Sequence, residues 1–159
     1  FILCTIHRAE NTNNPDHLKA IFEALNESGE RIILPLHPRT LKYMSDYGIK
    51  AAENIRIIEP LGYLDMVRLE ATAKKIVTDS GGVQKEAFFL GVSCVTLREE
   101  TEWVETVEDG WNILVGASKD RILEAIASFS PQTERKNHFG DGTSTAKITD
   151  LIKKVVADS

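Results

Sequence analysis

Short apolar runs alternate along this chain with longer segments in which apolar residues recur every three or four positions. The short runs are typical of buried strands, and the periodic segments are typical of helices that pack one face on a core. Asn14 before Pro15 predicts the first helix start, because asparagine caps a helix and proline favours its first turn. The expected strands are residues 1–6, 31–36, 54–58, 75–78, 93–97 and 112–115. The expected helices are residues 15–28, 39–47, 64–73, 83–90 and 103–108, a segment capped by Ser118, and a last segment with Ile148, Leu151, Ile152 and Val155 on one face.

Strands that alternate with helices predict a parallel sheet with helices on both faces. The expected fold class is therefore α/β, a Rossmann-like three-layer structure with a parallel sheet of about six strands. Pro35 is awkward inside a central strand because it cannot donate a ladder hydrogen bond, so we expect a strand end or a bulge there. No repeat, low-complexity tract or internal boundary divides residues 1–159, which predicts one domain.

Composition narrows the possible partners and the compartment. The formal net charge of −5, from 19 basic and 24 acidic residues, argues against a general nucleic-acid or membrane-surface partner. No apolar run of membrane-spanning length and no signal-peptide pattern is present. Cys4 and Cys94 lie in apolar runs, which indicates buried thiols in the cytoplasm rather than a disulfide. The chain begins at Phe1 inside an apolar run, so we expect it to be a piece of a longer protein.

Polar residues follow each of the first five predicted strands. In a parallel sheet the carboxyl ends of the strands share one edge, and ligands gather at that edge. The convergence of five strand ends carries more weight than any single motif. The candidates are His7 and Arg8, His37, Glu59, residues 79–82 and residues 98–102.

The sequence VTDSGGVQKEAFFLG at residues 77–91 places an acid, a serine and two glycines where a strand becomes a helix. The amides of residues 81–83 would be unpaired donors at the helix N-terminus, which favours an anion such as phosphate. Glycine permits a close approach, and Ser80 adds a hydroxyl donor. Glu86 lies one turn into the helix, where its carboxylate suits the vicinal hydroxyls of a ribose. Together these groups describe a nucleotide site, but they equally describe a tight turn capped by Ser80. Neither the GxxxxGK[ST] nor the GxGxxG pattern is present.

The histidines and acids of this edge also have plainer interpretations. A histidine at a strand end is often structural, and His37 before a proline more often orders a turn than binds a ligand. The four glutamates between positions 99 and 105 could act as paired acid and base, but a solvated helix start suits most of them better. Glu102 is the member that we single out.

Three segments carry a resemblance to a known family. HRAEN at residues 7–11, DSGGVQKEA at residues 79–87 and REETEWVETVEDGWNILVG at residues 98–116 resemble UDP-N-acetylglucosamine 2-epimerases. The resemblance covers nearly the whole chain, but only the C-terminal domain of the family. Those enzymes are similar to GT-B glycosyltransferases, in which two Rossmann-like domains enclose an active-site cleft. Residues 1–159 would then be the UDP-binding half of a GT-B-type enzyme, with the N-terminal domain absent.

The resemblance implies a role for each matched residue. His7 would be the catalytic group of this half, contacting the diphosphate and helping the sugar–phosphate bond to break. The glycine turn would hold phosphate oxygens, Glu86 would bind the ribose hydroxyls, and Arg98 would lie near the uridine nucleotide. The implied UDP-binding residues are His7, Ser80, Gly81, Gly82, Glu86 and Arg98.

The implied reaction is epimerisation at C2, which interconverts UDP-N-acetylglucosamine and UDP-N-acetylmannosamine. It proceeds by elimination of UDP to a 2-acetamidoglucal, followed by re-addition of UDP on the other face. The family uses no metal and no nicotinamide cofactor, and the chain has no metal-ligand spacing. The resemblance further implies polysaccharide biosynthesis in the cytoplasm and a homodimer of the full-length protein.

Two positions depart from the family pattern. Trp103 stands where the family often has an arginine near the nucleotide, and Met66 stands where it has an aromatic residue. The carboxylates that move protons at C2 belong to the absent domain, so the fragment alone should not catalyse the reaction. Three alternatives stay open: a hydrolysing epimerase, the donor domain of a GT-B glycosyltransferase, and a non-catalytic nucleotide-sugar-binding module.

Overall fold

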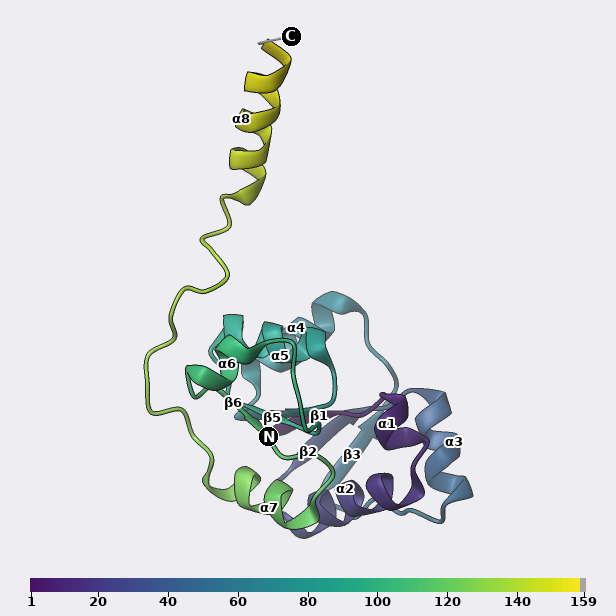
Figure 1. Ribbon diagram of the computed structural model, residues 1–159. Coiled ribbons are helices and arrows are strands. Elements are labelled where there is room, and N and C mark those ends of the chain that lie inside the picture. The colour runs from purple at the N-terminus through teal and green to yellow at the C-terminus, as the bar shows by residue number, and fades with distance from the viewer. Residues whose placement is uncertain (158–159) are drawn as a thin grey trace.

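The computed structural model describes residues 1–157 and contains one six-stranded parallel sheet between two layers of helices (Figure 1). The strands lie in the order β3-β2-β1-β4-β5-β6. Their bounds are β1 Ile2–Thr5, β2 Ile32–Pro35, β3 Ile55–Ile58, β4 Lys75–Thr78, β5 Cys94–Thr96 and β6 Asn112–Leu114. This arrangement confirms the predicted Rossmann-like α/β fold, since the six expected strands all form and pair in parallel.

Eight helices connect and follow the strands within the described residues. The short helix α1 was not expected, because four residues are too few to show a helical period. Ser118 occupies the N-cap position of α7 as expected, but its side chain makes no capping hydrogen bond. The bounds are α1 Ala9–Thr12, α2 Pro15–Glu27, α3 Pro38–Asp46, α4 Tyr63–Thr72, α5 Gly81–Leu90, α6 Val104–Glu108, α7 Lys119–Ser128 and α8 Ser144–Ala157.

Two hydrophobic cores hold the layers together. The larger core fills the sheet face that is covered by α2, α3 and α7, with Leu18, Phe22 and Ile122 almost fully buried. The smaller core lies on the opposite face, where Val83 and Ala87 of α5 pack against the sheet. Helices α2 and α7 are amphipathic because only one face of each packs on the larger core.

Pro35 lies at the last position of β2, as the sequence predicted. Strand β2 pairs with β1 through Ile32 and Ile33, so the missing amide of Pro35 interrupts no hydrogen bond to β1. On the other side, Pro35 is in register with Ile58 of β3. A proline in an interior strand is tolerated here because the ladder with β1 has already ended.

The sheet changes its winding direction between β1 and β4. These two strands are neighbours, yet the chain leaves β1 toward α2 on one face and leaves β4 toward α5 on the other. The loops that follow the two strands therefore part and leave a crevice at their carboxyl ends. His7 and the glycine turn lie on opposite sides of this crevice.

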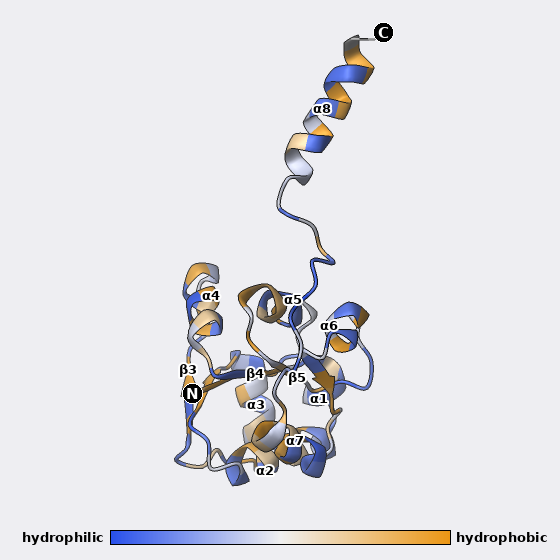
Figure 2. Cartoon of the chain, turned by 90° about the vertical axis from the view of Figure 1, so that its left-hand side faces the viewer, coloured by the Kyte–Doolittle hydropathy of each residue, from blue (hydrophilic) through white to orange (hydrophobic). Residues whose placement is uncertain are grey.

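Helix α8 stands away from the rest of the fold at the end of an extended segment (Figure 1). Its apolar residues form a stripe, as predicted, and Figure 2 shows them alternating with hydrophilic residues along the helix. Ile148, Leu151 and Ile152 are 57%, 62% and 58% exposed. None of the helices in the described part of the chain is both long and apolar enough to cross a membrane.

One buried lysine connects the sheet to α7. Lys75 begins β4, is 5% exposed, and donates from Nζ to the carbonyls of Ala125 and Ile126, each at 2.7 Å. Burial lowers the pKa of this amine. The two carbonyls lie near the C-terminus of α7, where the helix dipole favours a positive charge.

We expect Lys75→Met to lower the free energy of unfolding by about 2 kcal/mol, because two buried carbonyls lose a charged donor. Urea denaturation of the two proteins measures the difference. Lys74→Met is the matched control, since Lys74 is exposed and pairs with Glu30 at the surface. Equal losses in the two variants would contradict the assignment.

Candidate functional site

The carboxylate of Asp79 holds the crevice together. Asp79 directly follows β4 and is completely buried. It accepts hydrogen bonds from the backbone amides of His7 and Arg8, at 3.1 and 3.0 Å, and from Nδ2 of Asn11 at 3.1 Å. Asn11 also donates to the carbonyl of Leu97 at the end of β5. The ends of β1, β4 and β5 are thereby connected through one acid and one amide.

The same acid lies beside the ring of His7. Asp79 Oδ1 is 3.4 Å from His7 Nδ1, and the His7 side chain is 49% exposed. A proton on Nδ1 faces this carboxylate, which leaves Nε2 free for another partner. His7 is thus an accessible imidazole whose backbone and ring are both held by one buried acid.

The glycine turn is built partly as predicted. Thr78 Oγ1 accepts from the amide of Ser80 at 2.9 Å, and Ser80 Oγ accepts from the amide of Val83 at 3.4 Å. Ser80 is therefore the N-cap of α5, and the capping interpretation is confirmed. The prediction that the amide of Val83 is a free donor was wrong, because Ser80 Oγ accepts from it. The amides of Gly81 and Gly82 occupy the first two helical positions and have no hydrogen-bond acceptor among residues 1–157. Two donors and the positive end of the α5 dipole face outward here.

An ion-pair network flanks the turn. Glu102 pairs with Arg98 at 2.7 Å and with Arg8 at 3.4 Å. A Cβ at Gly81 would lie 2.5 Å from Oε1 of Glu102, so a larger residue there would displace this carboxylate from its present position. The backbone amide of Glu102 and the Arg98 guanidinium hold the pKa of Glu102 below its ordinary value. Glu102 thus differs from its solvated acidic neighbours, as the sequence suggested.

Polar contacts fix the loop after β5 onto α5. The indole of Trp103 donates to the carbonyl of Gly81 at 2.8 Å, and its ring lies 4.3 Å from Nζ of Lys85. Thr101 donates to Gln84 at 2.6 Å, and Gln84 is fully buried. The contact of Trp103 with Gly81 was not predicted. Asp79 was named only as one of the polar residues of the edge, and Gln84 was not singled out. The signal for both was their place beside the two glycines, where a buried polar residue must have partners.

A cavity of about 310 Å³ opens on one side of the turn. His7 and Ser80 line it together with apolar residues from the ends of β1, β2 and β3. His37 also lines it while capping α3, where its Nδ1 accepts from the amide of Arg39, so its expected role in ordering a turn is confirmed. The remaining lining residues are Thr5, Ile6, Pro35, Pro60, Leu61, Met66 and Val83.

Glu86 lies one turn further along α5 and is partly buried. It faces α4, where it interacts with the hydroxyl of Tyr63 and the carboxyl of Glu70. Met66 is on the same face of α4 and lines the cavity. An acceptor for hydroxyl groups is thus available on the α4 side of the turn.

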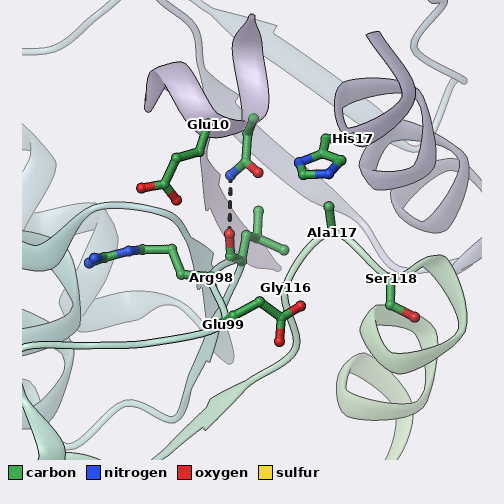
Figure 3. Close-up of a pocket in the computed structure, with 9 residues that line it drawn as sticks. Glu10, His17, Arg98, Glu99, Gly116, Ala117 and Ser118 are labelled. Carbon is green, nitrogen blue, oxygen red and sulfur yellow. Dashed lines mark hydrogen bonds between the residues drawn. The ribbon is translucent and has the colours of Figure 1, made fainter. Parts of the chain in front are cut away.

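Arg98 lies apart from this cavity. It is 8% exposed and lines a second cavity with Glu10, His17, Glu99 and Ser118 (Figure 3). Figure 3 shows Arg98 and Glu10 on one side of that cavity and His17 and Ser118 on the other. Arg98 is linked to the glycine turn by its ion pair with Glu102, whose carboxylate lies against Gly81. The structure thus brings His7 and Ser80 together around one cavity, places Glu86 on α5 but not among the residues that line that cavity, and connects Arg98 to the turn through Glu102.

This edge combines groups suited to a phosphorylated ligand. Two free amides, a helix N-terminus and two arginines offer positive potential. An apolar cavity, an imidazole and a carboxylate lie next to them. Such a set can bind an anion, an apolar ring and a pair of hydroxyls at once.

Comparisons with known proteins agree on one family. A family model described as UDP-N-acetylglucosamine 2-epimerase matches residues 1–153. A Methanococcus maripaludis protein described as a "UDP-N-acetylglucosamine 2-epimerase homolog" is 55% identical over 160 residues, covering 98% of this chain. A UDP-2,3-diacetamido-2,3-dideoxy-D-glucuronate 2-epimerase of Pseudomonas aeruginosa is 44% identical, also over 98% of this chain.

Solved structures agree in fold. The Methanocaldococcus jannaschii UDP-GlcNAc 2-epimerase in complex with UDP-GlcNAc and UDP matches 97% of this chain and 45% of its own, with a TM-score of 0.88 and 42% identity. The Escherichia coli heptosyltransferase WaaC with ADP, at 16% identity and a TM-score of 0.52, shows similarity of fold alone. The chain spans about 45% of the length of its two relatives named above.

We expect Asp79→Asn to destabilise the chain by about 2–3 kcal/mol, because a neutral amide oxygen cannot satisfy three donors that a carboxylate accepts. Urea denaturation measures the loss, and amide NMR shifts should change at His7, Arg8 and Asn11. Glu59→Gln, an exposed acid at the same sheet edge, should change neither. An unchanged midpoint in Asp79→Asn would show that this carboxylate does not organise the edge.

Proposed function

This chain belongs to the UDP-N-acetylglucosamine 2-epimerase family, and we propose that it is the nucleotide-binding half of an enzyme that inverts C2 of a UDP-N-acetylhexosamine. The family model covers residues 1–153, which confirms the resemblance carried by the HRAEN, DSGGVQKEA and REETEW segments. The observation that carries the proposal is the pair of free amides at Gly81 and Gly82, which adjoin an apolar cavity and an accessible histidine.

The diphosphate of UDP binds at the glycine turn in this proposal. The amides of Gly81 and Gly82 and the hydroxyl of Ser80 donate to phosphate oxygens, with the α5 dipole behind them. A Cβ at Gly82 would meet no atom closer than Ser80 Oγ at 3.8 Å, so open space lies where a phosphate would approach. Arg98 contributes through Glu102, as part of the positive flank of the turn.

The nucleoside occupies the adjoining cavity. Met66, Leu61 and Val83 offer an apolar surface for the uracil ring. Met66 replaces the flat aromatic face expected in the family, and its flexible thioether can still pack on a ring. Glu86 accepts hydrogen bonds from the ribose hydroxyls.

His7 assists departure of UDP. Elimination removes the proton at C2 and breaks the bond between C1 and the phosphate oxygen, which leaves a 2-acetamidoglucal and UDP. As an imidazolium, with Nδ1–H toward Asp79 and Nε2–H toward the leaving oxygen, His7 stabilises the developing negative charge there together with the free amides. UDP then adds again to C1, and C2 receives a proton on the opposite face. The base and acid for C2 belong to the other half, so the fragment alone is inactive.

Two observations support a larger parent protein. The chain corresponds to about 45% of its relatives' length. The apolar stripe of α8, including Leu151 and Ile152, is exposed on a helix that stands away from the sheet. A second domain that closes over the sheet edge would complete the active site, and the parent would pair as a homodimer. The free, buried thiols of Cys4 and Cys94 support a cytoplasmic location.

A second UDP-sugar is a candidate substrate of the parent protein. The Pseudomonas relative, 44% identical to this chain, is named for a UDP-sugar with two acetamido groups and a carboxylate. The proposed site on this chain contacts the nucleotide, so it accommodates either sugar. The other half of the parent would choose between them.

The first test is a titration of this chain with UDP, followed by amide NMR shifts. We expect shifts at His7, at residues 80–86 and at Arg98. Gly82→Ala should weaken binding at least about tenfold by filling the phosphate approach, while stability stays equal or rises because alanine favours the helix. Gly62→Ala is the matched control, because a Cβ there has no neighbour within 4 Å. Absence of UDP binding in this chain and in the full-length parent would contradict the proposal.

The second test is the activity of the full-length parent. We expect NMR of a UDP-GlcNAc solution to show conversion to UDP-ManNAc, with the diacetamido uronate as the alternative substrate, and no conversion by this chain alone. Release of free N-acetylmannosamine would indicate a hydrolysing epimerase, and transfer to an added acceptor would indicate a glycosyltransferase. UDP binding without turnover of either sugar would indicate a non-catalytic module.

A further inference from the structure

Glu70 is an acid in an unusual environment. It lies in the last turns of α4 and is fully buried. Neither of its carboxyl oxygens accepts a hydrogen bond from an N–H or hydroxyl group among residues 1–157. Met66 and Leu69 of the same helix join the smaller hydrophobic core, so the surroundings offer little compensation for a charge. A bare carboxylate in such a place is strongly unfavourable.

The group nearest to this acid is a second acid. Glu86 of α5 brings its carboxyl within hydrogen-bonding reach of Glu70. Two ionised carboxylates cannot bond, because neither has a proton to donate. The contact therefore requires one proton, shared between Glu70 and Glu86.

Burial decides which of the two acids keeps that proton. Burial and the charge of Glu86 raise the pKa of Glu70 to about 8. The other titratable groups that face the pair are Cys94 of β5 and Tyr63 of α4. Burial raises the pKa of Cys94 to about 12, and the charge of Glu86 raises the pKa of Tyr63. Neither competes for the proton near neutral pH.

Tyr63 and Glu70 hold Glu86 from two sides. They are seven residues apart, which places them two turns apart on one face of α4. The hydroxyl of Tyr63 interacts with the Glu86 carboxylate, and Met66 lies between the two along the helix, where it lines the cavity. Glu86 does not itself line the cavity, whereas Met66, on the same face of α4 as Tyr63 and Glu70, does.

We propose that Glu70 is a positioning residue: as a neutral acid it donates a hydrogen bond to the Glu86 carboxylate and so directs that carboxylate toward the ribose hydroxyls of the nucleotide. This inference rests on the proposed function, which assigns the ribose to Glu86. One carboxylate oxygen of Glu86 receives the Glu70 proton, and the other accepts from the ribose. Ionisation of Glu70 breaks this bond and sets two like charges against each other, so nucleotide binding weakens in mildly alkaline solution.

Stability tests the acid pair without a ligand. Glu70 ionises near pH 4.5 when unperturbed and near pH 8 in the fold. Between these values the folded chain binds more protons than the unfolded chain, so this group makes stability fall as pH rises toward 8. Glu70→Gln removes that dependence. We expect its melting temperature, compared with wild type, to rise by about 5 °C more at pH 8.5 than at pH 5.5.

Asp65→Asn is the matched control for the stability test. Asp65 is an exposed acid on the same helix, so its replacement should leave the pH dependence of wild type unchanged. A Glu70→Gln melting curve that follows wild type at every pH would overturn the acid pair.

Nucleotide affinity tests the positioning role. We expect UDP to bind wild type and Glu70→Gln equally at pH 6.5, because the glutamine amide also donates to Glu86. At pH 9 wild type should bind about tenfold more weakly than Glu70→Gln, the typical effect of losing a hydrogen bond to a charged group. Ionisation of UDP affects both proteins alike, so the ratio of affinities reports Glu70.

A nucleotide without the ribose hydroxyls tests whether the effect of Glu70 acts through the ribose. At pH 9, wild type and Glu70→Gln should bind 2′,3′-dideoxyuridine diphosphate with equal affinity, since the hydroxyl–carboxylate contact is gone. The Glu70→Gln change should likewise leave the affinity for UDP unaltered when it is made in Glu86→Ala. A difference that persists under both conditions, or equal affinity of the two proteins for UDP at pH 9, overturns the role of Glu70 and leaves the proposed function intact. No binding of UDP by wild type at any pH overturns both.

Discussion

The buried carboxylate of Asp79 is the interaction on which the functional edge depends. Parallel strands leave the backbone amides of the following loops without partners, and at the β1–β4 switch point those loops diverge to opposite faces of the sheet. Asp79 accepts from two amides of the loop after β1 and from Asn11, which itself binds the end of β5. One charge therefore closes three strand ends around a crevice. A water molecule could satisfy the same donors singly, but it could not fix the loops relative to one another.

The glycine turn gains its chemistry from this fixed frame. The side chains of Ser80 and Thr78 accept from two of the four N-terminal amides of α5, which leaves the amides of Gly81 and Gly82 directed outward. Glu102 lies against Gly81 and pairs with Arg8 and Arg98, so the positive charges near the turn are held in place before a ligand arrives. Pre-organised donors are what a departing diphosphate requires, because they stabilise charge without rearranging. In the proposed function, the other half of the parent would supply proton transfer and this half the leaving-group site.

Buried acids serve opposite purposes in this domain. Asp79 is surrounded by donors and organises the backbone, whereas Glu70 has no donor among residues 1–157, and burial raises its pKa. Burial is complete at both positions, so the two acids differ in their hydrogen-bonding partners and not in their exposure. The first acid fixes the loop after β1 at the crevice, and in our proposal the second directs Glu86 toward the ribose.

The sequence by itself determined the alternation of six strands with helices, the end of β2 at Pro35, the cap of α2 at Asn14 and the family, because these depend on local periodicity, local backbone chemistry and contiguous motifs. It also placed His7 and the glycine turn on one edge, since parallel strands share their carboxyl ends. Only the tertiary structure decided that Asp79 and Gln84 are internal anchors, that Trp103 binds Gly81, that Arg98 opens into a separate cavity and that Glu70 meets Glu86. Those contacts join residues from different elements, up to 72 positions apart for His7 and Asp79. No local pattern encodes such pairs, because they arise when the packing of helices against the sheet sets the distance between side chains.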